Sequence, residues 1–121
     1  MKSIISFIAV IAALSMPALA HHSHGNYQMT EYTHLEGVVT EFIFMNPHSW
    51  VYMSVVGEDG ASKIWALESG SVGALERAGV YAETIVPGDK ISVRCHQLKD
   101  GANGCLLGFL TPPGSVENEW D

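Results

Sequence analysis

Histidines are the residues of this chain whose number and spacing point to chemistry. The sequence of 121 residues contains six of them, at positions 21, 22, 24, 34, 48 and 96. Three fall within four consecutive positions, and neutral imidazole is a ligand for copper, zinc and nickel. This cluster predicts that His21, His22 and His24 bind a divalent metal, copper or zinc. His48, which follows Asn46-Pro47 in a predicted loop, is the candidate to complete the site.

The residues before the cluster are expected to form a signal peptide over residues 1–20. Lys2 precedes an apolar run, and Ala18-Leu19-Ala20 provides a small-x-small cleavage site. Cleavage there would expose the amine of His21 as a further nitrogen ligand. The apolar run is about half the length needed to cross a bilayer, and no second run follows, so no membrane span is expected. These features predict a periplasmic or secreted protein.

Other interpretations of the histidines remain open. The His-rich segment, residues 21–33, could be solvated and bind metal only weakly. His48 could belong to a simple turn in which its ring bonds to a backbone carbonyl. A copper-dependent oxidase, with His21 chelating the metal through its amine and ring, would need a substrate surface that the sequence does not identify. No Ser-His-Asp order, phosphate-binding loop or Cys-x-x-Cys motif occurs, so a binding protein is expected rather than an enzyme.

Composition restricts the partners. The chain has 6 Lys and Arg against 13 Asp and Glu, a net charge of −7, and 47% hydrophobic residues. It is therefore too apolar for a disordered chain and too acidic to hold nucleic acid, and a cationic or neutral partner is favoured. In an exported protein, two cysteines predict a disulfide. Turn residues separate Cys95 from Cys105, so the two are expected to face each other across a hairpin.

Short β-strands separated by turns must position these residues. Strands are predicted over 34–45, 50–56, 63–68, 90–95 and 105–110. A short helix is predicted over 72–78, capped by Ser71 and ended by Gly79. This order predicts a mainly β fold, a small five-stranded OB-like barrel with one short helix between strands three and four. The barrel domain should cover residues 34–112, with a flexible tail over 113–121; a small β-sandwich is the alternative.

An OB-like barrel suggests a second function. Such folds present ligands on the face of strands two and three and on adjoining loops. The chain could therefore be a recognition module for a small molecule, peptide or glycan, without a metal. Asn46, Trp50, Trp65 and Glu68 are the candidate ligand-binding residues. Alternatively, most of the aromatic side chains fill the barrel.

An ordered set of short motifs carries a family resemblance. It consists of His21-His22-Ser23, Glu41-Phe42-x-x-x-Asn46-Pro47-His48, Trp65-x-x-Glu68, Leu75-x-Arg77-Ala78-Gly79, Pro87-Gly88-Asp89 and Asp100-Gly101. In these the chain resembles the DUF6152 family of small exported bacterial proteins. The resemblance implies an exported bacterial domain and no particular activity. The chain departs from the family pattern at His24, where an aromatic residue is usual, and at Cys95 and Cys105, where small residues are expected.

Overall fold

The structure is a closed five-stranded β-barrel with one short helix, as the sequence predicts. The computed structural model describes residues 24–121. Its strands are β1 (Thr33–Ile43), β2 (Trp50–Val56), β3 (Ser62–Glu68), β4 (Lys90–Gln97) and β5 (Gly104–Thr111), and its helix is α1 (Val72–Arg77). A 3₁₀ turn, η1 (His24–Asn26), precedes the barrel, and a two-residue strand, β6 (Asn118–Glu119), follows it. No helix within residues 24–121 is long and apolar enough to cross a membrane.

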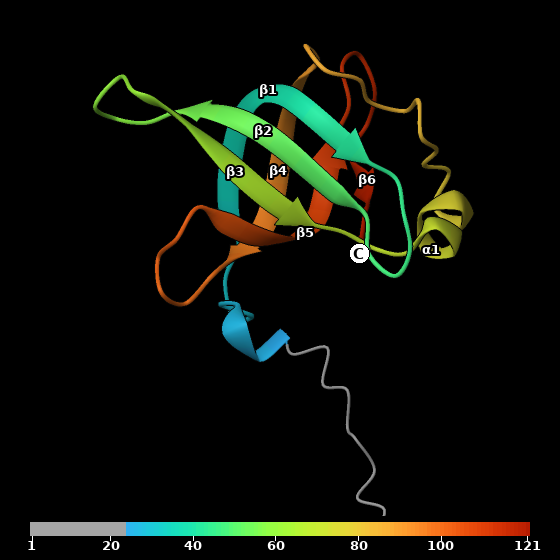
Figure 1. Ribbon diagram of the computed structural model, residues 1–121, viewed down its shortest axis with the longest axis horizontal. Coiled ribbons are helices and arrows are strands. Elements are labelled where there is room, and N and C mark those ends of the chain that lie inside the picture. The colour runs from blue at the N-terminus through green and yellow to red at the C-terminus, as the bar shows by residue number, and fades with distance from the viewer. Residues whose placement is uncertain (1–23) are drawn as a thin grey trace, which may run out of the picture.

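The barrel closes through one parallel strand pair. β1 pairs with β2 and β4, β2 pairs with β3, and β4 pairs with β5, all antiparallel. β3 then pairs with β5 in parallel over Ala66–Glu68 and Gly104–Leu106. This connectivity, with α1 between β3 and β4, confirms the predicted OB-like barrel (Figure 1). It brings the loop between β1 and β2 and the exit of β3 to one end of the barrel.

The strands alternate apolar residues toward the barrel interior. Fully buried side chains come from every barrel strand and include Val39, Val51, Met53, Leu67, Ile91, Val93, Leu107 and Leu110. Period-two burial is the pattern of a sheet with one face packed and the other in water. The outward-facing positions of the strands are consequently the ones available to a ligand.

β1 is long and contains a β-bulge. The register shifts between Val39 and Glu41, so the bulge lies beyond Gly37. Gly37 serves a different purpose: a Cβ there would collide with the carbonyl oxygen of Ser54 on β2. β1 also ends before Met45, because both backbone groups of Met45 bond to the Ser49 hydroxyl, at 3.2 and 3.1 Å.

Local signals account for α1. The Ser71 hydroxyl accepts a hydrogen bond from the Ala74 amide at 3.2 Å, as an N-cap does. Gly79 follows the helix with a φ of 80°, a conformation that glycine adopts without strain. Leu75 points into the core and is 1% exposed. The predicted end at residue 78 is one residue beyond the observed end, since Ala78 is the C-cap.

The expectation of a flexible tail over 113–121 is wrong for its last residues. Asn118 and Glu119 pair with Leu110 and Phe109 of β5. The Trp120 side chain is fully buried and its ring lies 5.4 Å from that of Phe42. The sequence around Trp120 is strongly polar, so local patterning favoured solvent, and burial of one large aromatic ring overrides it.

Candidate functional site

Glu68 is the centre of a polar network on the outside of the barrel, at the end of β3. Its Oε2 accepts a hydrogen bond from the Tyr27 hydroxyl at 2.6 Å. Its Oε1 lies 3.4 Å from Nδ1 of His48. The Glu68 carboxylate, 41 residues after Tyr27 in the chain, therefore joins the segment that precedes β1 to the loop between β1 and β2.

The loop over residues 44–49 holds His48 in place through its backbone. Ser49 and Ser69 are both buried, and the Ser69 amide donates to the Ser49 carbonyl at 2.8 Å. The Asn46–Pro47 bond is cis. The Asn46 side chain points away from the network and accepts from the Val72 amide at 2.9 Å, at the start of α1. Asn46 thus links this loop to the helix and lies apart from His48 and Glu68.

The surroundings of His48 determine which ring nitrogen carries its proton. Nδ1 lies 3.3 Å from the Ser69 carbonyl oxygen and 3.4 Å from Glu68. Both neighbours accept hydrogen bonds, so Nδ1 is the donor, and in the neutral ring Nε2 then holds the lone pair. A carboxylate behind one nitrogen and a ligand on the other is the usual environment of a metal-binding histidine. A structural contact to the Ser69 carbonyl, the alternative interpretation of this histidine, is present as well.

Tyr27 is the network residue that the sequence did not indicate. It is only 9% exposed and forms an isolated bridge with Leu98, at the start of the β4–β5 loop. Burial, followed by the hydrogen bond and charge of Glu68, raises the pKa of its hydroxyl above the ordinary 10.0. The phenol therefore stays a neutral hydrogen-bond donor to Glu68. A single tyrosine in a polar stretch has no periodicity, so no sequence signal singled it out.

Tyr27 also fixes the position of His24. The Tyr27 amide donates to the His24 carbonyl at 3.0 Å, closing η1. His24 itself is exposed. His21 and His22, and the predicted signal peptide, lie outside the described residues. Among residues 24–121, no group of three or more His, Cys, Asp and Glu side chains is arranged to hold a metal ion.

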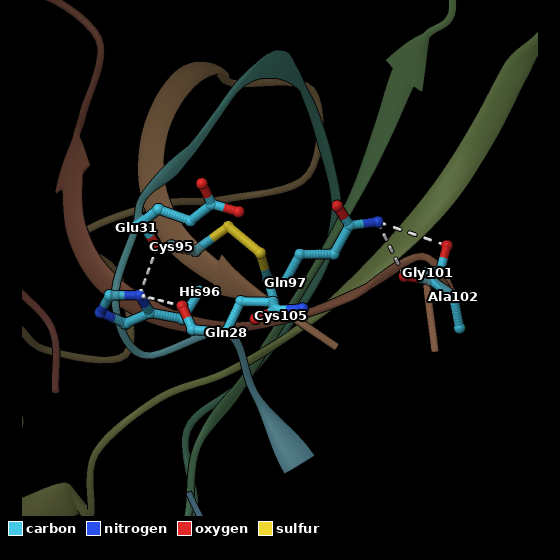
Figure 2. The surroundings of a disulfide bond; sticks show 8 residues. All are labelled: Gln28, Glu31, Cys95, His96, Gln97, Gly101, Ala102 and Cys105. Carbon is cyan, nitrogen blue, oxygen red and sulfur yellow. Dashed lines mark hydrogen bonds between the residues drawn. A yellow bond between two sulfur atoms is a disulfide. The ribbon is translucent and has the colours of Figure 1, made fainter. Parts of the chain in front are cut away.

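His96, next to the disulfide, ties the same N-terminal segment to the barrel. Cys95 and Cys105 form the predicted bond, with their Cα atoms 5.6 Å apart. They are diagonal rather than directly opposite, because the register shifts after Arg94 and Cys105 pairs with Gln97. Nδ1 of His96 reaches the carbonyl oxygens of Gln28 at 3.0 Å and Glu31 at 2.6 Å (Figure 2). The Tyr32 ring stacks on His96 at 4.4 Å.

The two candidate tryptophans lie on different faces of the barrel wall. Trp50 is directly opposite Glu68 in the β2–β3 register, and its ring stacks at 6.5 Å on that of Tyr52. Trp65 pairs with Met53, which is buried, and packs against the core. The structure therefore brings His48, Trp50 and Glu68 together and separates Trp65 and Asn46 from them. Phe42 and Phe44 pack against the core, as the alternative interpretation of the aromatic residues expects.

Comparison with known proteins identifies a family. Residues 9–107 match the model described as a family of unknown function, DUF6152. The chain belongs to the DUF6152 family. Neither the curated proteins nor the solved structures contain a match to it. The disulfide of this DUF6152 domain is consistent with an extracytoplasmic location, because such bonds persist in oxidising compartments.

Proposed function

We propose that this DUF6152 domain binds a divalent transition metal, copper or zinc, at His48 with histidines of residues 21–24. The observation that carries the proposal is the double role of Glu68. It orients the His48 ring through Nδ1 and anchors Tyr27, three residues after His24. Tyr27, close in sequence to the histidine cluster, and His48 thus contact the same carboxylate.

Each part of this network suits a metal ligand set. A proton on Nδ1 of His48 would leave Nε2 as the coordinating atom, and a carboxylate behind the other ring nitrogen is a usual partner of a metal-binding histidine. The negative charge of Glu68 also offsets the charge of a bound cation. His21 and His22 would supply the remaining nitrogen ligands, together with the amine that cleavage after Ala20 would create.

Titration calorimetry of the processed, untagged protein with Zn(II) and with Cu(II) tests the proposal. We expect one ion per chain, proton release on binding, and loss of affinity below about pH 6, where protons compete for imidazole. His48→Ala and His21→Ala should each weaken binding strongly. His34→Ala is the matched control, because His34 is exposed on β1 and pairs with Arg94 away from this network.

Glu68→Gln tests whether metal binds at a site organised by Glu68 or at the histidine segment alone. It keeps the shape of the side chain and removes its charge, so metal affinity should fall about 10-fold to 100-fold. If His48→Ala and Glu68→Gln both bind as the wild type does, the histidine cluster binds metal as an independent tail and the proposed site is wrong.

A further inference from the structure

The outer face of β2 and its two neighbours carries an aromatic pair framed by carboxylates. Directly opposite residues of an antiparallel ladder share a face of the sheet. Tyr52 lies opposite Glu41 of β1 and Trp50 lies opposite Glu68 of β3. The stacked rings of Trp50 and Tyr52 are therefore flanked by one carboxylate on each side.

Glu68 already accepts a hydrogen bond from Tyr27 and lies 3.4 Å from His48, so Glu41 is the carboxylate on this face that a ligand would contact. β2 contains no basic residue, and Lys63, the one basic residue of β3, pairs with Val55 and so lies on the opposite face. Glu41 is exposed, and Trp50 and Tyr52 are half-buried. No helix or strand of the described chain lies across this face (Figure 1). The surface is therefore both open and negatively charged.

We infer that this face binds an organic ammonium ion, with the ammonium group over the rings of Trp50 and Tyr52 and beside Glu41. The face of an aromatic ring attracts a cation through its quadrupole, and tryptophan does so most strongly. An ammonium group with alkyl substituents also buries apolar surface against the rings. The inference gives the recognition function of the barrel a chemical class of ligand.

Geometry limits the size of the ligand. Adjacent strands are about 4.8 Å apart, so β1 and β3 are about 10 Å apart across β2. Glu41 and Glu68 are also offset by two positions along β2, because their partners are Tyr52 and Trp50. One ammonium group can thus contact a ring and one carboxylate, that of Glu41.

Nuclear magnetic resonance titration of the metal-free protein with choline chloride tests the inference. The indole N–H signal of Trp50 should shift and saturate with a Kd of about 1 mM, which is what one or two cation–π contacts and a partly solvated carboxylate provide. The shift should weaken with added salt. The indole of Trp120, which is fully buried, serves as an internal reference and should not move.

Matched variants make the test specific. Glu41→Gln should weaken choline binding about fivefold, and Trp50→Leu should abolish it. Glu36→Gln removes the same charge from the same strand. Glu36 pairs with Ser92 of β4, away from the aromatic pair, so this variant should bind choline as the wild type does. Tyr52→Phe keeps the ring and should retain binding.

Three outcomes would overturn the inference. The first is the absence of a saturable shift at about 10 mM choline, well above the expected Kd. The second is an equal response to 3,3-dimethyl-1-butanol, the uncharged isostere, which would show apolar contact alone. The third is unchanged binding by Glu41→Gln. The result is independent of the metal proposal, because Glu41 belongs to the ammonium site only and His48→Ala should leave choline binding intact.

Discussion

Among the single residues of the site, Tyr27 and Glu68 form the hydrogen bond on which its geometry depends. The phenol is almost fully buried and its partner is a carboxylate, so their hydrogen bond should exceed a neutral one in strength. Tyr27→Phe removes only the hydroxyl and should lower the free energy of unfolding by about 1–2 kcal/mol. Urea denaturation measures this. Tyr81→Phe, at an exposed tyrosine, should change stability little, and equal effects at both positions would contradict the assignment.

The same pair predicts a dependence on pH. The pKa of Tyr27 is raised above 10.0 in the folded protein, chiefly by burial and then by Glu68. Above about pH 10 the unfolded chain loses this proton before the folded one, so stability should fall with rising pH. The contribution is complete below that pH. Denaturation curves from about pH 8 to pH 11 should fall more steeply for the wild type than for Tyr27→Phe, and parallel curves would refute the coupling.

Two glycine-to-alanine substitutions within secondary-structure elements should change stability in opposite directions, one through close packing and the other through chain entropy. Gly37→Ala would push a Cβ into the Ser54 carbonyl between β1 and β2 and should destabilise by about 2–4 kcal/mol. Gly73→Ala, inside α1, meets only Arg77 Nη1 at 3.5 Å. It should stabilise by up to about 1 kcal/mol, because alanine loses less entropy in a helix. Thermal unfolding of both variants checks the opposite signs.

The packing of α1 on the barrel can also be tested by substitution. Leu75 lies in the core at 1% exposure, so Leu75→Ala should cost about 2–4 kcal/mol. Glu76 is the adjacent exposed position, and Glu76→Ala should change the free energy of unfolding by less than about 0.5 kcal/mol. Similar small losses at both positions would mean that the helix does not pack on the barrel.

The elements were predictable because their signals are local. Alternating apolar residues, turn residues and the Ser71 cap determine where the strands and α1 begin and end, within a few positions. β1 ends earlier than predicted because the Ser49 hydroxyl bonds to both backbone groups of Met45, a contact that the residue types alone do not indicate. His48, Trp50 and Glu68 were recognised as candidates by residue type and loop position. Tyr27 was missed because only the closed barrel brings it to Glu68.

The last residues of the chain stabilise the molecule as a whole. Trp120 is fully buried against Phe42, and its backbone carbonyl accepts from the Ser69 hydroxyl and the Gly70 amide. Trp120→Ala should lower the free energy of unfolding by about 3–5 kcal/mol. Val116→Ala, at a position 79% exposed in the same segment, is the control and should be nearly neutral. Chemical denaturation of the two variants would contradict this role if they proved equally stable.

The disulfide is the other stabilising feature at this scale. It closes a loop of sequence separation 10 between β4 and β5. Reduction should lower the free energy of unfolding by about 2–3 kcal/mol, through the greater freedom of the unfolded chain. A Cys95→Ala, Cys105→Ala double variant should show no response to reductant. Comparable stability of the oxidised and reduced wild type would show that the bond does not restrain the fold.

The parallel pairing of β3 with β5 gives the barrel a preferred place to open. It spans only Ala66–Glu68 and Gly104–Leu106, and is the shortest ladder in the wall. Local opening at this seam, the ladder between β3 and β5, should let its amides exchange hydrogen with solvent. The free energy of opening should be lower here than for the amides between β2 and β3. Glu68 is the last residue of the seam, and Tyr27 spans it from Leu98. Any ligand that holds Glu68 should therefore slow exchange in β5, a strand it never touches.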